Sequence, residues 1–249
     1  MRYSRQEIFP EIGKSGQNKL IKSTVAIVGL GALGSVSSEL LARAGIGNLV
    51  LIDRDIVELT NLQRQSLYDE NDIGKPKAAA AKEKLNKTNS EINVEIHADD
   101  LNFENVKILN GSDLILDCTD NLETRFLIND YSIKNNVPFI YSSAVGSKGY
   151  TFNIVPHKTA CLRCFLDEKM PNETCETGGV LNSITHLIPS LQANEAIKIL
   201  LKKDFEKRLI FFDVWKNELA KINVTKNSNC ICCAKKISSI FRAKNPQRP

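Results

Sequence analysis

A glycine-rich segment directly after an apolar run is the feature that most constrains the fold of this chain. The run VAIV (residues 25–28) is typical of a buried strand, and Gly29-x-Gly31-x-x-Gly34 follows it, ahead of a helix-like stretch. In such a turn the first glycine permits a tight bend, the second lets a phosphate approach the backbone, and the third allows close helix packing. The segment therefore predicts a nucleotide-binding strand–turn–helix unit.

Strand-like and helix-like segments alternate through the first 145 residues. Apolar and β-branched runs predict strands at residues 24–29, 48–53, 94–97, 114–118 and 138–144. Periodic segments predict helices at residues 2–21, 32–44, 75–89 and 122–135, the first interrupted near Pro10 and Gly13. This alternation favours an α/β fold, here a Rossmann-like, mostly parallel sheet with helices on both faces.

The pattern changes after residue 146. We expect a strand at 150–155, a cysteine-containing loop at 156–179, a long helix at 181–201 that Pro189 kinks or interrupts, and a β-hairpin of residues 208–215 and 218–224. The absence of a repeat or a low-complexity linker predicts one continuous domain over residues 1–233. A basic tail at residues 234–249 follows it.

Composition narrows the class of protein. The net charge is +4, and the tail contributes +5, so residues 1–233 carry −1 and show no basic excess typical of a nucleic-acid-binding domain. No apolar run approaches the length of a membrane span, and no N-terminal segment resembles a signal peptide. With seven cysteines, an odd number, we expect reduced thiols in a cytoplasmic protein rather than a disulfide framework.

Asp53 ends the second predicted strand, 19 residues beyond Gly34. An acid at this position can bind a ribose hydroxyl. With the glycine turn and this acid alone, the default interpretation is an NAD-dependent oxidoreductase.

Three further segments favour a triphosphate. The sequence NLQRQ (residues 61–65) places amides and a guanidinium after the acid. Lys77 lies in the first turn of a predicted helix, where a cation opposes the helix dipole unless it faces an anion. The sequence DCTDN (residues 117–121) ends a strand, a position suited to a carboxylate that binds a metal ion. Arg, Lys and such a carboxylate around one phosphate loop suit a triphosphate better than a dinucleotide.

The cysteines form two Cys-x-x-Cys pairs, Cys161 with Cys164 and Cys230 with Cys233. Four thiolates satisfy a tetrahedral Zn²⁺ and leave no open position for catalysis. The long separation of the pairs leaves redox dithiols or two unrelated pairs as alternatives. Cys118, inside a predicted strand, is expected to be an inert core thiol, and Cys232 a bystander.

These pieces, in this order, resemble the ThiF/HesA/MoeB family of adenylating enzymes, the bacterial and archaeal relatives of ubiquitin-activating enzymes. The resemblance covers nearly the whole chain, from the N-terminus to Cys233. It is carried by RYSRQ (residues 2–6), GLGALG (29–34), Asp53, NLQRQ, Lys77, DCTDN, the two cysteine pairs and TCETGGV (174–180).

The resemblance implies a role for each matching residue. An ATP site would be built from Gly29, Gly31, Gly34, Asp53, Asn61, Arg64, Gln65, Lys77, Asp120 and Asn121. Within it Asp53 would bind the ribose, Asn61, Arg64 and Lys77 the phosphates, and Asp120 a Mg²⁺ ion. Arg5 would reach the site of a neighbouring subunit in a homodimer. The four paired cysteines would share one structural Zn²⁺, and Cys175 would be able to form a covalent link to the substrate.

The implied activity is ATP-dependent adenylation of the C-terminal glycine of a small β-grasp, ubiquitin-like protein of the ThiS or MoaD type. The product is an acyl-adenylate, which can then receive sulfur from a separate donor protein. An NAD-dependent oxidoreductase and an inactive scaffold of the same fold are the alternatives. A measurement of which nucleotide binds distinguishes the oxidoreductase from an adenylating enzyme. ATP–pyrophosphate exchange distinguishes the inactive scaffold from an active enzyme.

Overall fold

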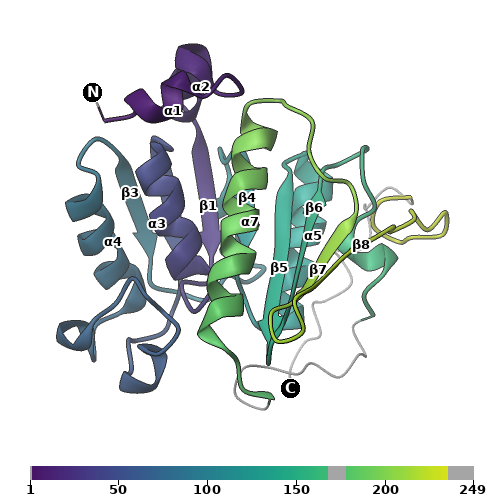
Figure 1. The fold of residues 1–249 in the computed structure, drawn as a ribbon. Coiled ribbons are helices and arrows are strands. Elements are labelled where there is room, and N and C mark those ends of the chain that lie inside the picture. The colour runs from purple at the N-terminus through teal and green to yellow at the C-terminus, as the bar shows by residue number, and fades with distance from the viewer. Residues whose placement is uncertain (1, 168–177, 235–249) are drawn as a thin grey trace.

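The computed structural model describes residues 2–167 and 178–234, which form a single eight-stranded sheet covered by helices (Figure 1). Parallel strands make up one part, in the order β3 (Asn93–His97), β2 (Asn48–Ile52), β1 (Thr24–Val28), β4 (Leu114–Asp117) and β5 (Phe139–Val145). Three antiparallel strands extend it beyond β5, namely β6 (Lys148–Ile154), β7 (Leu209–Asp213) and β8 (Glu218–Ile222). The predicted α/β fold and its terminal hairpin are confirmed.

Helices cover both faces of the sheet, as the alternating pattern predicts. In Figure 1, α3 (Gly34–Ala44), α4 (Lys77–Thr88) and α7 (Asn182–Leu200) lie in front, and α5 (Leu122–Asn135) lies behind. The side chains of β1 alternate between the two cores, because successive residues of a strand point to opposite faces. Val25 and Ile27 belong to the cluster under α3 and α7, and Ala26 and Val28 to the cluster under α5.

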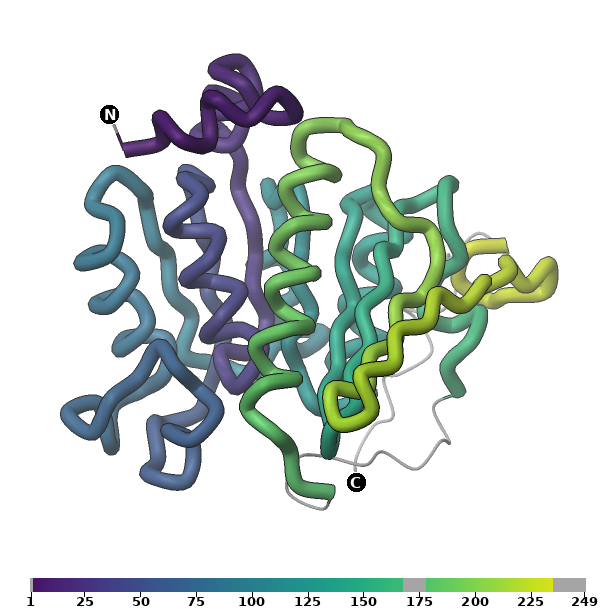
Figure 2. The backbone as a smooth tube through the Cα atoms, in the orientation of Figure 1, coloured from purple at the N-terminus to yellow at the C-terminus, as the bar shows by residue number. Residues whose placement is uncertain are grey.

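Two short helices lie at the edge of the sheet where the parallel strands begin. They are α1 (Ser4–Ile8) and α2 (Gly13–Leu20), so the predicted interruption near Pro10 and Gly13 is confirmed. Strand β1 leads away from them, and the backbone in Figure 2 shows the glycine turn at the other end of this strand. Five residues of strand span about 17 Å, which separates the N-terminal helices from the nucleotide turn.

The long helix α7 runs unbroken from Asn182 to Leu200 with Pro189 inside it. Of the two outcomes predicted at Pro189, a kink or an interruption, the interruption is therefore excluded. Ile184 and Ile188 are fully buried, and a Cβ on Gly149 of β6 would lie 2.3 Å from Ile188. Close packing on the sheet stabilises this helix more than the proline weakens it. No helix among the described residues is long and apolar enough to cross a membrane.

Candidate functional site

The glycine turn connects β1 to α3, and its three glycines meet different demands. Gly29 has a φ of +87°, and a Cβ there would lie 2.7 Å from the carbonyl oxygen of Cys118. A Cβ on Gly34 would lie 1.8 Å from the carbonyl oxygen of Gly29. A Cβ on Gly31 would meet only the Gln65 amide, at 3.7 Å. Packing thus requires Gly29 and Gly34, whereas Gly31 keeps the backbone accessible from the cavity beside it.

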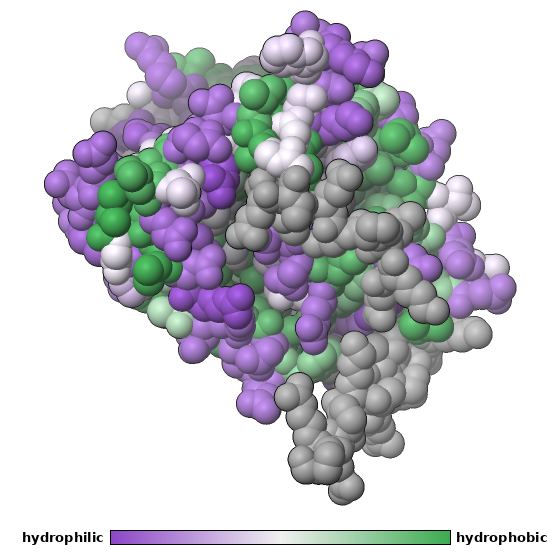
Figure 3. Space-filling view, turned by 90° about the horizontal axis from the view of Figure 1, so that it is seen from below, coloured by the Kyte–Doolittle hydropathy of each residue, from purple (hydrophilic) through white to green (hydrophobic). Residues whose placement is uncertain are grey.

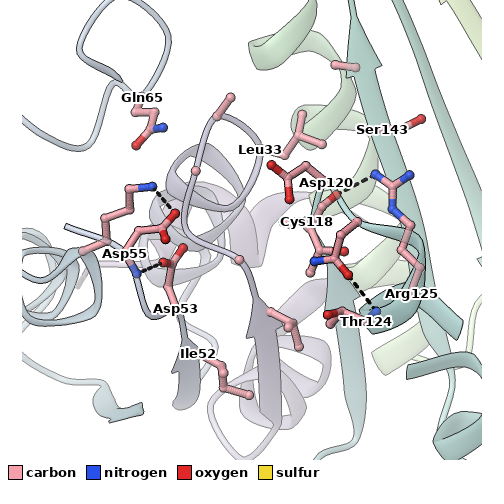
Figure 4. A pocket seen from close by; sticks show the side chains of 18 of the residues that line it. Leu33, Ile52, Asp53, Asp55, Gln65, Cys118, Asp120, Thr124, Arg125 and Ser143 are labelled. Atoms are coloured by element: carbon pink, nitrogen blue, oxygen red, sulfur yellow. Dashed lines mark hydrogen bonds and ion pairs between the residues drawn. The ribbon is translucent and has the colours of Figure 1, made fainter. Parts of the chain in front are cut away.

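A cavity of about 840 Å³ opens at the carboxyl ends of the parallel strands, where ligands bind in α/β sheets of this kind. It brings together nine of the residues that the sequence assigns to the nucleotide: Gly29, Gly31, Asp53, Asn61, Arg64, Gln65, Lys77, Asp120 and Asn121. Figure 4 shows Asp53, Asp55 and Gln65 on one side of the turn, and Asp120 and Arg125 on the other. Figure 3 views this end of the molecule, where hydrophilic residues surround smaller hydrophobic areas.

Asp53 follows β2 and is held by backbone donors. Its two carboxylate oxygens accept hydrogen bonds from the N–H of Leu30 at 2.6 Å and of Asp55 at 2.8 Å. Burial raises the pKa of Asp53 above its ordinary value, and the nearby ammonium of Lys77 and these N–H groups lower it in part. Each oxygen keeps a second lone pair, so the fixed carboxylate can still accept a hydrogen bond from a ligand hydroxyl.

Lys77 is the first residue of α4, and its ammonium faces an anion, as its unfavourable position in the helix predicts. The anion within the chain is Asp55, whose carboxylate lies 3.0 Å from the Lys77 Nζ. The backbone N–H of Lys77 also donates to the Asp55 carbonyl at 2.8 Å. Asp55 was not among the residues predicted from the sequence, although its position two residues after the ribose-binding candidate Asp53 was the available signal.

The segment NLQRQ folds against the glycine turn through a short 3-10 helix, Leu59–Asn61. Asn61 is buried and closes a capping box with Glu58, and Arg64 donates to the Thr60 carbonyl at 2.8 Å. Gln65 is 3% exposed, and its Oε1 is a buried acceptor with no hydrogen-bond donor among the described residues. An unsatisfied amide oxygen in the wall of a cavity is suited to a ligand that donates a hydrogen bond.

The opposite wall contains the predicted metal carboxylate. Asn121 caps α5, since its Oδ1 accepts the N–H of Thr124 at 2.8 Å. The cap of this helix is thus Asn121, and the carboxylate of Asp120 lines the cavity at a strand end. A carboxylate in this position fits a Mg²⁺ ion that also binds phosphate oxygens.

Arg125 is a second residue that the sequence analysis missed. Its guanidinium donates to the Thr119 carbonyl at 2.6 Å, lies 5.1 Å from the centre of the Tyr141 ring, and approaches Asp117 to 3.8 Å. Burial raises the pKa of Asp117, and the charge of Arg125 lowers it in part. Arg125 therefore ties the turn that carries Asp120 to the neighbouring strand β5. Its place in the first turn of α5 gave no sign of burial.

The four paired cysteines meet in one cluster, which excludes the alternative of two unrelated pairs. Their Sγ atoms all lie within 4.8 Å of one another, with separations of 3.9 Å for Cys161–Cys164, 3.6 Å for Cys161–Cys230 and 3.4 Å for Cys164–Cys233. Four sulfurs at about 2.3 Å from a tetrahedral Zn²⁺ lie about 3.8 Å apart. The cluster therefore fits a structural zinc ion. Cys232 lies beside it and accepts from Asn129 at 3.2 Å.

Cys118 lies in the core at the end of β4, as predicted. Burial, followed by the charge of Asp117, raises the pKa of its thiol to about 12. At pH 8 the thiolate fraction is then about 10³-fold below that of an ordinary thiol, and alkylation needs the thiolate. We expect iodoacetamide to leave Cys118 unmodified in folded protein at pH 8 and to modify it in urea, as measured by peptide mass spectrometry. Equal modification in both states would contradict the core assignment.

Among the described residues, two that the sequence assigns to the nucleotide site, Gly34 and Arg5, do not line the cavity. Arg5 is exposed on α1, at the edge of the sheet where the strands begin, and does not line the cavity of its own chain. Cys175 and residues 235–249 of the basic tail lie outside the described residues. The covalent role of Cys175 and the role of the tail thus stay predictions.

Comparison with known proteins identifies the family of this chain. The model of the ThiF family matches residues 3–232. The sulfur carrier protein ThiS adenylyltransferase of Bacillus subtilis is 42% identical over 241 residues, which cover 94% of this chain and 72% of the relative. The adenylyltransferase and sulfurtransferase MOCS3 of Culex quinquefasciatus is 40% identical, and this chain spans 55% of its length. The crystal structure of Escherichia coli MccB with ATP superposes with a TM-score of 0.83 at 27% identity, covering 94% of this chain and 74% of MccB.

The chain belongs to the ThiF family, and the resemblance drawn from its motifs is confirmed. Its relatives include enzymes named as adenylyltransferases, which confirms the predicted enzyme class. The alternative of an NAD-dependent oxidoreductase is thereby set aside.

Proposed function

We propose that this enzyme uses ATP to adenylate the C-terminal glycine of a small ubiquitin-like protein of β-grasp fold that ends in Gly-Gly. One observation carries the proposal: Asp53, Arg64, Lys77 and Asp120 come from four separate segments and line the same cavity beside the glycine turn. The ThiS adenylyltransferase relative supports a small carrier protein as substrate, and the MccB complex supports ATP.

In the proposed reaction, a carboxylate oxygen of the terminal glycine attacks the α-phosphorus of ATP. The new O–P bond forms while the bond to the β-phosphate oxygen breaks, and pyrophosphate leaves with that electron pair. Asp53 orients the ribose, and the N-terminus of α3 with Gly31 receives phosphate oxygens. Arg64 and Lys77 stabilise the charge that develops on pyrophosphate. Lys77 must then exchange its ion pair with Asp55 for one with a phosphate.

The charges of the cavity support a divalent cation with the nucleotide. Among the described residues, its lining contains six acids and five bases: Asp53, Asp55, Glu58, Asp99, Asp100 and Asp120 against Arg54, Arg64, Lys77, Arg125 and Lys148. Because acids are in excess, a triphosphate needs an additional positive charge. Asp120 would hold a Mg²⁺ ion, which neutralises phosphate charge when bound.

The test is ATP–pyrophosphate exchange with purified protein and the sulfur carrier ThiS of Bacillus subtilis as the probe substrate. We expect radioactive pyrophosphate to enter ATP only when the carrier is present, and a carrier lacking its last glycine to be inactive. Neither an oxidoreductase nor an inactive scaffold of the same fold would give this exchange. Exchange that is equal with and without any carrier tested would contradict adenylation of a protein terminus.

We further propose a homodimer in which Arg5 completes the site of the partner subunit. Its own cavity is at the opposite edge of the sheet, so only a second copy would bring Arg5 to a phosphate. We expect Arg5→Ala and Asp120→Ala proteins to be inactive alone and mixed dimers to regain about half of the activity of a wild-type dimer, measured by exchange. Mixed dimers verified by mass spectrometry that show no recovery would contradict the trans role.

Cys175 is proposed to act only after adenylation. The phosphate chemistry assigned above needs no thiol, so we expect Cys175→Ala to retain exchange within about twofold of wild type. The same variant should lose any reducible adduct with the carrier, detected on non-reducing gels. Loss of exchange in a folded variant would place Cys175 in the first step, and a persisting adduct would move the covalent role to another cysteine.

A further inference from the structure

The middle of α5 makes contacts that neither its amphipathic pattern nor the proposed reaction requires. Asn129 is fully buried, and its side chain reaches both cysteine pairs. Its Oδ1 accepts the N–H of Leu162, between Cys161 and Cys164, at 2.8 Å. Its Nδ2 donates to the Sγ of Cys232, between Cys230 and Cys233, at 3.2 Å. One amide thus connects two segments that are almost 70 residues apart in the sequence.

The next residue of α5 strengthens the same connection. Asp130 receives two hydrogen bonds from the guanidinium of Arg163, at 2.7 and 2.8 Å, in a fork geometry. Arg163 also stacks over the ring of Phe126, with 4.5 Å between the guanidinium carbon and the ring centre. Charge-assisted, bidentate pairs of this kind are shorter and stronger than neutral hydrogen bonds. Since Asp130 and Arg163 are largely buried, the first cysteine pair is firmly attached to α5.

The same helix forms a wall of the nucleotide cavity one turn earlier. Arg125 lies four residues before Asn129, on the same side of the helix. Arg125 stacks on Tyr141, and Phe165, which follows Cys164 directly, packs edge-on against Tyr141 with 6.4 Å between ring centres. Arg125, Tyr141 and Leu166 line the cavity, and we name these three residues the cysteine-side wall.

We infer that Asn129 is a positioning residue that fastens both cysteine pairs to α5, so that the four-thiolate centre braces the cysteine-side wall of the nucleotide cavity. Groups that hydrogen-bond around metal ligands fix the orientation of these ligands. Metal bound at the cysteines would thereby stabilise the conformation of Arg125 and Tyr141 in which nucleotide binds. The nucleotide part of this inference rests on the proposed function, and the metal part does not.

The metal part is tested by the rate at which a colorimetric chelator removes zinc from the full-length protein. We expect Asn129→Ala to release zinc about tenfold faster than wild type, although all four cysteines are intact. Asn135→Ala is the matched control, because the side chain of Asn135, on the same helix, donates to the Tyr131 carbonyl. Equal release from both variants would overturn the inference. If Asn129→Ala does not fold, Asp130→Asn, which keeps the shape of the side chain, is expected to accelerate release in the same way.

The predicted coupling between zinc binding and nucleotide binding is tested by equilibrium zinc competition with and without Mg²⁺ and ATP. Because coupling between two binding sites is reciprocal, ATP should tighten zinc binding by the factor by which zinc tightens ATP binding, about fivefold. The factor should shrink in Asn129→Ala. If ATP binds, as measured by calorimetry, but does not change the affinity for zinc, the inferred coupling between the cysteine centre and the nucleotide cavity is wrong. A protein that binds no ATP would overturn the proposed function instead, and zinc release from the variants would still decide the role of Asn129.

Discussion

Replacing Asp120 by alanine is expected to lower ATP–pyrophosphate exchange by about 10³-fold while the protein remains folded. The carboxylate lies in the wall of the cavity, in the turn that follows β4, where it would hold the cation that neutralises phosphate charge. Removing one preorganised electrostatic group from an active site costs about 10²–10³ in rate, and a lost metal ion adds to this. Exchange is measured with saturating ATP, Mg²⁺ and carrier.

The fold should tolerate this change, because Asn121 and not Asp120 caps α5. We therefore expect a melting temperature within about 3 °C of wild type. Glu123→Ala is the matched control: Glu123 is an exposed carboxylate in the first turn of the same helix and lies outside the cavity lining. Exchange by Asp120→Ala that is within a few-fold of this control would exclude the metal role.

The order of strands and helices was predictable because local patterns determine it. In β1 and β2 the apolar runs are continuous, as expected for strands buried on both faces, and the glycine turn fixes where β1 ends. The path of α7 was not predictable. A proline is a local signal for a break, whereas the packing of Ile188 against Gly149 of β6 depends on residues about 40 positions apart.

The members of the site were more predictable than their contacts. Lys77 was identified because a cation at a helix N-terminus is unfavourable without an anion. The buried Arg125 was missed, because nothing local distinguishes it from a solvated surface charge, and Asp55 was missed although it lies two residues after Asp53. Both are explained by the parallel sheet, which brings the ends of β2 and β4 to one edge. The shared cysteine cluster similarly follows from the fold, because spacing alone leaves two unrelated pairs possible.

The loss of one cysteine ligand should have the largest effect on stability. We expect one Zn²⁺ per chain in the purified protein, and less than about a tenth of that in Cys161→Ser and Cys230→Ser, as measured by elemental analysis. The melting temperature should fall by about 10 °C, which corresponds to about 3 kcal/mol for a chain of this length. The physical reason is that the sulfurs of Cys161 and Cys230, 3.6 Å apart, join the loop after β6 to the segment after β8.

The Cys232→Ser variant tests whether Cys232 is a zinc ligand or only a thiol beside the cluster. Cys232 is buried beside the cluster but is not one of its four members. A serine hydroxyl there can still accept the hydrogen bond from Asn129, so this variant should keep one zinc ion and melt within about 3 °C of wild type. Full zinc content and unchanged melting in both Cys161→Ser and Cys230→Ser would refute the shared site. If Cys232→Ser loses its zinc, Cys232 and not its neighbour Cys233 is the fourth ligand of the centre.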